Sequence, residues 1–316
     1  MLTLLQSHNL DVDFFDTQDF KFNKLLVLRM FRKVVACNTL YYMPAHNNLT
    51  YLFPIIYWLS RLFHTRIHYF VVGGWLAEFL KGKPRHSRKL AKIAGIHCET
   101  HSLKESLEEN YGFHNVDVFP NFRITDFTPT AHHEEGKLKL VFMARILKMK
   151  GLDLVFKLGD EIQRRGLQEH ITIDFYGPRQ NEDDDVDYFN SNLAKYGFMR
   201  YKGLLKPTDI YCTLEQYDAM LLPTHFYTEG MPGSILDAYI SGIPVIVTKW
   251  KYASEFVDDG KSGMIIPFED DGSALVEAVL KLYDDTVLLN RMKLAAREQW
   301  RSFSSERAFE LLQSYK

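Results

Sequence analysis

The sequence has 316 residues, a length that suits two domains of ordinary size. Hydrophobic residues make up 46% of it and charged residues 25%, which is the composition of a globular chain and excludes a disordered one. The formal net charge of −2 excludes the basic footprint of a nucleic-acid-binding protein. The three cysteines, odd in number and widely spaced, fit neither a disulfide framework nor a zinc site, so they favour a reducing, cytoplasmic compartment.

Short apolar runs alternate with longer amphipathic segments along the chain, and this pattern predicts parallel sheets covered by helices. The predicted strands are, in chain order, 12–15, 67–72, 138–143, 171–176, 219–223 and 244–248. The predicted helices are 49–63, 103–111, 151–165, 185–196, a short one around 214–216, 233–241, 272–283 and 304–314.

The polar segment 125–136 contains Pro129 and lacks periodicity, so it is predicted to link two domains. The first domain is expected to span 1–128 and the second 136–299, with 300–316 crossing back onto the first. The acidic run 181–187 is interpreted as a solvated loop or a helix start. The first residues lack the apolar core of a signal peptide, so none is expected.

Two carboxylates, Glu229 and Asp237, stand eight positions apart around a Gly-Met-Pro-Gly turn. Pro232 suits a first helical position, because its fixed φ is helical and its missing N–H needs no partner there. Gly242 suits the left-handed residue that ends a helix. Free N–H groups and the helix dipole favour an anion at such a helix start. The two carboxylates are instead good acceptors for hydroxyl groups, so together the features indicate a nucleotide sugar.

Two cations flank another predicted strand-to-helix turn. Arg145 directly follows a buried strand, where ligands bind in open α/β sheets, and Lys150 precedes Gly151 and the next helix. Arg by its planar fork and Lys as a point charge can together hold a diphosphate. They would also offset the charge of a departing diphosphate, so no metal and no other cofactor is demanded.

Residues 65–300 resemble the retaining glycosyltransferases of family four, which are marked by Glu, seven residues and Glu; here the second acid is Asp237. Further landmarks stand in family order at 118–121, 139–151, 173–178, 202–205 and 248–263. The resemblance implies an α/β GT-B fold, two Rossmann-like domains facing a cleft. It also implies transfer of a sugar, with retention, from a nucleoside diphosphate sugar to a glycan or lipid-linked oligosaccharide in surface polysaccharide synthesis.

The resemblance also implies roles for individual residues. Glu229, Arg145 and Lys150 would form the catalytic centre. The donor would be bound by the backbone of Met231, Pro232 and Gly233, by Asp237 at the ribose, and by a base pocket of Gly177, Leu204 and Leu205. On the acceptor side stand His46, Gly74 and Trp75.

Two features of the first domain leave alternatives open. Trp75 either packs on its own domain or stacks on an acceptor sugar, and many relatives carry a histidine near here that this chain lacks. The aromatic segment 51–63 is either a core helix or an interfacial helix whose Trp58, Arg61 and Arg66 meet a membrane as a peripheral contact. It is too short to span a bilayer, which needs about 20 residues.

The first domain also looks shortened at its N-terminus by about one βα pair, so a partner chain that completes it is an expected alternative. Two other functions remain open for the chain. One is a nucleotide-sugar epimerase or phosphorylase of the same fold. The other is a non-catalytic nucleotide-sugar binding protein or partner subunit.

Overall fold

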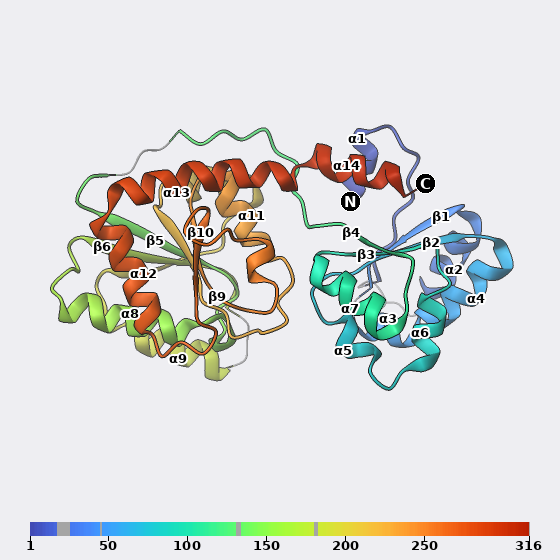
Figure 1. The fold of residues 1–316 in the computed structure, drawn as a ribbon, viewed down its shortest axis with the longest axis horizontal. Coiled ribbons are helices and arrows are strands. Elements are labelled where there is room, and N and C mark those ends of the chain that lie inside the picture. Colours follow the sequence, from blue (N-terminus) through green and yellow to red (C-terminus); the bar gives the residue numbers. More distant parts are fainter. Residues whose placement is uncertain (18–25, 45, 131–133, 180–182, 316) are drawn as a thin grey trace. The chain divides into compact units, whose positions relative to one another are not determined.

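The chain folds into two units, each built on its own parallel sheet (Figure 1). Unit 1 comprises Met1–Ile124 and Ser305–Lys316, and unit 2 comprises Thr125–Ser304. The structure is a computed structural model and describes residues 1–17, 26–44, 46–130, 134–179 and 183–315. Asn181 and Glu182 of the acidic run lie outside the described residues, and a helix begins directly after them at Asp183.

Unit 1 contains α1 (Leu2–Ser7), α2 (Leu26–Ala36), β1 (Thr39–Tyr42), α3 (His46–Tyr51), α4 (Phe53–Phe63), β2 (Arg66–Phe70), α5 (Leu76–Leu80), α6 (Pro84–Leu90), β3 (Gly95–Cys98), α7 (His101–Tyr111), β4 (Val116–Val118) and α14 (Ser305–Ser314). Its strands pair in the order β1-β2-β3-β4, all parallel. Thr100 caps α7 by accepting from the Leu103 N–H, and Gly112 ends it in the left-handed conformation.

The predicted strand at 12–15 is wrong, because this segment has no strand pairing in the structure. Its backbone is held to α2 instead: Lys33 forms an ion pair with Asp13, and its ammonium donates to the Phe14 carbonyl at 2.9 Å. The place beside β2 at the edge of the sheet is taken by β1, which pairs with β2 from Thr39↔Arg66 onward. Alternation of polar and apolar residues cannot show which segment obtains a strand partner.

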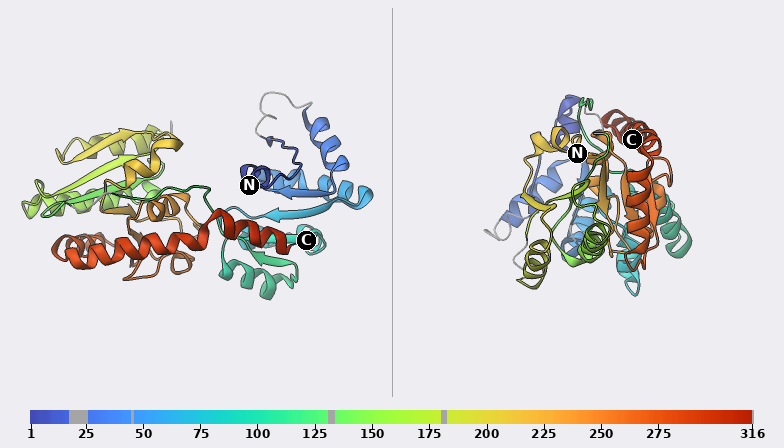
Figure 2. Two further views of the ribbon diagram at one scale, coloured as in Figure 1. Left: turned by 90° about the horizontal axis from the view of Figure 1, so that it is seen from above. Right: turned by 90° about the vertical axis from the view of Figure 1, so that its left-hand side faces the viewer.

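The two ends of the chain meet in unit 1, where α14 lies beside α1 (Figures 1 and 2). Leu4 and Leu5 of α1 are buried with Ala308 and Leu312 of α14. The Tyr315 hydroxyl then donates to the Val118 carbonyl of β4 at 3.0 Å. Apolar burial and one long-range hydrogen bond therefore join the C-terminal helix to the first sheet.

Unit 2 contains β5 (Leu138–Met143), η2 (Lys148–Lys150), α8 (Leu152–Arg164), β6 (Ile171–Tyr176), α9 (Asp183–Leu193), β7 (Met199–Gly203), η3 (Pro207–Asp209), α10 (Ile210–Leu214), β8 (Ala219–Leu222), α11 (Gly233–Ile240), β9 (Val245–Thr248), η4 (Ala253–Glu255), β10 (Gly263–Ile266), α12 (Ser273–Asp284), α13 (Thr286–Gln299) and η5 (Trp300–Phe303). The predictions of β5 and β6 are confirmed to the residue. No pattern in the sequence predicted α13, which Asp285 caps by accepting from the Leu288 N–H.

The strand order of unit 2 is β10-β9-β8-β5-β6-β7, and every neighbouring pair is parallel. The chain therefore adds strands from β5 toward β7 at one edge of the sheet, and from β8 toward β10 at the other edge. Right-handed crossovers then place the connecting helices on opposite faces. Figure 1 shows α8 and α9 on one side of this sheet and α11 and α13 on the other. The fold is the α/β GT-B type, as expected.

Candidate active site

The neighbouring strands β5 and β8 mark the point where the chain direction across the unit 2 sheet reverses, with Leu140↔Ala219 and Val141↔Met220 in register. Open α/β sheets bind ligands beyond the carboxyl ends of their strands at such a switch point. The loops after four strands bring predicted site residues to this edge: Arg145 after β5, Gly177 after β6, Leu204 after β7 and Glu229 after β8.

Lys150 and Glu229, predicted from different motifs, form an ion pair across this edge. The Lys150 ammonium donates to Glu229 Oε2 at 2.5 Å, and the two side chains are 8% and 20% exposed. The same ammonium lies 5.0 Å from the centre of the Phe226 ring. A pair this sheltered interacts more strongly than a surface pair and holds a defined geometry.

A close backbone approach at Gly151 places Lys150 beside the end of β8. Gly151 has φ +86°, and a Cβ there would lie 1.9 Å from the Pro223 carbonyl oxygen. Only glycine fits such a position, because a side chain would overlap the backbone and strain the left-handed φ. The turn from η2 into α8 therefore depends on this glycine.

The fully buried Thr224 organises the loop that follows β8. Its hydroxyl accepts from the Phe226 N–H at 3.2 Å and lies 3.2 Å from the Met149 carbonyl and 3.4 Å from Glu229 Oε2. From β9, the Thr248 hydroxyl donates to the Thr224 carbonyl at 2.5 Å. These bonds tie η2 and β9 to the loop that presents Glu229.

A second pair at this edge, His225 and Asp153, was not predicted from the sequence. His225 Nε2 lies 2.8 Å from Asp153 Oδ1, and the His225 N–H donates to the Met149 carbonyl at 2.9 Å. Asp153 stands in the first turn of α8, where an acid is favoured by the helix dipole. A histidine directly after the buried run of β8 was the available signal for this pair.

The helix predicted at 233–241 begins at Gly233 as α11, but Pro232 does not take the first helical position that its fixed φ suggested. Pro232 precedes the helix with ψ 125°, and Gly233 is its first residue, because the Pro232 backbone is extended rather than helical. Met231 is buried beside this start. Asp237 is 6% exposed one turn into the helix. Gly242 follows with φ +71°, which confirms the predicted left-handed helix end.

Gly177 joins the loops of three strands. A Cβ on Gly177 would lie 1.7 Å from the Ala144 carbonyl oxygen, after β5. The Gly177 N–H donates to the Gly203 carbonyl at 3.0 Å, and the Gly177 carbonyl accepts from the Tyr201 hydroxyl at 2.9 Å. Leu205 is partly buried, whereas Leu204 is 67% exposed. The segment after β7 is thus held against the β6 loop.

Arg145 does not contact the Lys150–Glu229 ion pair through a hydrogen bond or an ion pair. It is exposed, and within the described part of the chain its side chain forms no hydrogen bond or ion pair. The guanidinium is therefore available to a ligand at the carboxyl end of β5.

The residues predicted for the acceptor side belong to unit 1, where two of them pack together. The rings of His46 and Trp75 lie 5.1 Å apart, and both contact Phe79. The Trp75 indole N–H donates to the Val72 carbonyl at 2.7 Å. Gly74 is buried in the same turn. Trp75 therefore packs on its own domain, although it stays partly exposed.

Across the described ranges, no group of three or more histidine, cysteine or acidic side chains is arranged to hold a metal ion. None of the helices in those ranges is both long and apolar enough to cross a membrane.

The chain resembles known glycosyltransferases in sequence. It is 24% identical over 219 residues to the D-inositol 3-phosphate glycosyltransferase of Arthrobacter sp. strain FB24, covering 65% of this chain and 51% of that protein. It is 25% identical over 167 residues to the glycogen synthase of Mycobacterium tuberculosis H37Rv, covering 52% and 38%. The chain thus spans about half or less of the length of these curated relatives.

Solved structures share the fold over most of this chain. Anabaena Alr3699/HepE in complex with UDP and glucose superposes with a TM-score of 0.76 at 15% identity, covering 99% of this chain and 88% of that one. TarM superposes with a TM-score of 0.70 at 18% identity, covering 88% and 54%. The sequence model of the family "Glycosyl transferases group 1" matches residues 125–299, more than half of the chain. The chain belongs to this family of transferases.

Proposed function

We propose that this protein transfers a sugar from a nucleoside diphosphate sugar to a hydroxyl group of a glycan or lipid-linked oligosaccharide. The Lys150–Glu229 pair at the β5/β8 switch point carries the proposal. A cation suits a diphosphate and a carboxylate suits sugar hydroxyls, and a nucleotide sugar presents both groups side by side. UDP, which is bound in the Alr3699/HepE structure, is the first candidate nucleoside diphosphate.

Donor binding has to exchange the partners of this pair. The diphosphate would take the Lys150 ammonium, with Arg145 as a second cation, and a sugar hydroxyl would then donate to the released Glu229 carboxylate. The backbone from Met231 to Gly233 would contact the donor sugar and phosphate. Pro232 has no N–H, so the donating group would be the N–H of Gly233, the first residue of α11, which has no partner within the helix.

The remaining donor-site residues are assigned to the nucleoside. Asp237 would accept from the ribose hydroxyls, and Gly177, Leu204 and Leu205 would border the base. The exposed Leu204 offers an apolar surface that a stacked base would cover.

The proposed chemistry is transfer with retention. The bond between the sugar C1 and the diphosphate oxygen breaks, the acceptor oxygen bonds to C1 on the same face, and the acceptor proton passes to the departing diphosphate. Lys150 and Arg145 would stabilise the charge that develops on this leaving group, so the proposal needs no metal ion and no separate cofactor. His46, Gly74 and Trp75 remain the proposed acceptor side.

The proposed setting is surface polysaccharide synthesis in the cytoplasm, with a peripheral contact to the inner face of the membrane. The function of the curated glycogen synthase, which builds a glycan, agrees with a carbohydrate acceptor. A requirement for a partner chain is a separate question, which an assay with and without cell extract answers.

The test is turnover of radiolabelled UDP- and GDP-sugars with a crude lipid-linked acceptor extract. Formation of a labelled glycan supports transfer, and the anomeric configuration of the product, read by NMR, tests retention. Nucleotide affinity without turnover under any condition would instead indicate a non-catalytic binding protein. An epimerised free donor would indicate an epimerase.

A further inference from the structure

An apolar stripe runs along the solvent side of α4. Ile55, Trp58 and Leu62 follow one another at helical spacing and are 46%, 65% and 69% exposed. Tyr51, at the end of α3, extends the stripe one turn further and is 73% exposed. The opposite side of α4 is buried in unit 1 and is largely apolar as well, so the exposed stripe is a second apolar side that unit 1 leaves uncovered.

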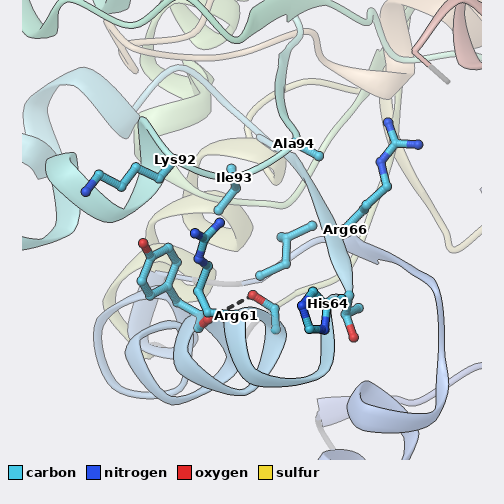
Figure 3. A pocket seen from close by; sticks show the side chains of 10 residues that line it. Arg61, His64, Arg66, Lys92, Ile93 and Ala94 are labelled. Atoms are coloured by element: carbon cyan, nitrogen blue, oxygen red, sulfur yellow. Dashed lines mark hydrogen bonds between the residues drawn. The ribbon is translucent and has the colours of Figure 1, made fainter.

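A cationic groove borders this stripe (Figure 3). It is an open cavity of about 380 Å³ between α4, the start of β2 and the segment after α6, and its lining contains no carboxylate. The cations in the lining are Arg61, Arg66 and Lys92, with His64 at the end of α4. Figure 3 shows Arg61 extending from α4 toward Ile93, with Lys92 and Arg66 on either side of it.

Two of the groove cations differ from those basic residues of unit 1 that are held in ion pairs. Lys33, Lys81 and Lys104 each pair with an acidic side chain of unit 1. Arg61 and Lys92, in contrast, form no ion pair or side-chain hydrogen bond with any residue in the described ranges. The groove therefore keeps an uncompensated positive charge directly beside exposed apolar side chains.

We propose that α4 and this groove dock on an anionic lipid bilayer. This names the surface and the lipid chemistry of the membrane contact in the proposed function, on which it rests. Ile55, Trp58 and Leu62 would enter the boundary between headgroups and acyl chains, while Arg61 and Lys92 contact lipid phosphates. Tryptophan favours this boundary because its ring is apolar and its N–H is polar.

The dimensions agree with a helix that lies in the plane of the membrane. The 11 residues of α4 extend about 16 Å, well below the about 30 Å needed to cross the hydrocarbon core. A protein partner would have to supply carboxylates for the groove and an apolar surface for the stripe in matching positions. An anionic bilayer offers phosphates and acyl chains side by side everywhere on its surface.

The experiment is cosedimentation of the purified chain with vesicles of phosphatidylcholine, with and without phosphatidylglycerol. The protein is expected to pellet with the anionic vesicles only and to be released by added salt. Arg61→Gln and Lys92→Gln should each weaken partitioning about fivefold, and Trp58→Ser with Leu62→Ser should abolish it. The matched controls on α12 and α13, Val287→Ser with Leu294→Ser and Lys281→Gln with Arg297→Gln, should bind like wild type.

The affinity of each variant for UDP is measured in parallel. Unchanged UDP affinity with lost vesicle binding assigns the defect to the surface, and vesicle binding can be read even if the proposed transfer fails. The proposal is overturned if anionic vesicles never pellet the wild type, or if surface and control variants lose binding equally. It is also overturned if Trp58→Ser with Leu62→Ser only dissociates a dimer, which would make a second copy the occupant.

Discussion

The two units use charge in opposite ways. In unit 2, Lys150 and Glu229 are largely buried and hold each other at the switch point of the sheet. In unit 1, Arg61, Arg66 and Lys92 line an open groove and form no ion pair with any residue that the structure describes. A sheltered pair has to be held in one geometry, because leaving either charge unpaired is costly, and this suits a ligand of defined shape. Exposed cations are screened and loosely placed, which suits an extended anionic surface.

Backbone packing should produce the largest effect on the ordered site of unit 2. Gly151→Ala is expected to lower the free energy of unfolding by about 3–4 kcal/mol, because a left-handed Ala costs about 1–2 kcal/mol and its Cβ overlaps the Pro223 carbonyl. Gly166→Ala, at the other end of α8, is the matched control. Its φ is also positive but its surroundings are open, so only about 1–2 kcal/mol is expected. Urea unfolding measures both; equal losses would show that the close approach is unimportant.

Removal of the sheltered cation should have the next largest effect. Lys150→Ala is expected to weaken UDP binding about 10- to 100-fold, because a hydrogen bond to a charged group contributes about 1.5–3 kcal/mol. The matched control is Lys148→Ala in the same turn, whose side chain is 48% exposed and lies 3.9 Å from Asp185. It should change the affinity by no more than about twofold. Calorimetry with UDP decides the point, and similar losses in both variants would contradict a special role for Lys150.

The two carboxylates should separate sugar from nucleotide. Glu229→Ala is expected to remove the extra affinity for a UDP-sugar, about tenfold for one hydrogen bond to a carboxylate. It should leave UDP binding unchanged or tighter, because Lys150 loses its competing partner. Asp237→Ala should weaken both ligands, since ribose is common to them. A Glu229 variant that loses UDP and UDP-sugar affinity equally, with its fold intact, would refute this assignment.

Unit 1 should reveal a pH dependence that arises from two buried histidines of its sheet, His68 and His97. Burial, and then the neighbouring His68, lower the pKa of His97 to about 3, and burial also lowers the pKa of His68. The unfolded chain then binds protons near pH 6.5 while the folded chain does not, so stability is complete above that pH and is lost as the pH falls. The loss for His97 is about 2 kcal/mol between pH 6.5 and about 5.

His97→Phe should reduce this loss while keeping the ring that stacks on Tyr315 at 4.2 Å. His114→Phe, at an exposed position, is the control and should keep the wild-type pH dependence. Urea unfolding near pH 7 and near pH 5 provides the measurement. An unchanged slope in the His97 variant would show that other groups dominate the acid sensitivity of unit 1.

Local sequence patterns predicted the regular parts of the donor unit well. The strands at 138–143 and 171–176 were placed to the residue, because their apolar runs are buried by helices on both faces of a parallel sheet. The same reasoning failed at 12–15 and missed β1, since both segments are short and only the fold decides which of them pairs with β2.

The sequence by itself therefore determined the class of the fold and the residue types of the candidate site, because hydrophobic periodicity and the helix-ending chemistry of Gly242 are local properties. Tertiary structure alone decided that the Lys150 ammonium lies 2.5 Å from Glu229 Oε2, although the two residues are 79 positions apart. It also decided that His225 meets Asp153 and that the apolar stripe of α4 stays uncovered. Such contacts depend on the strand order and on glycine-permitted backbone approaches, which bring together segments that no local pattern relates.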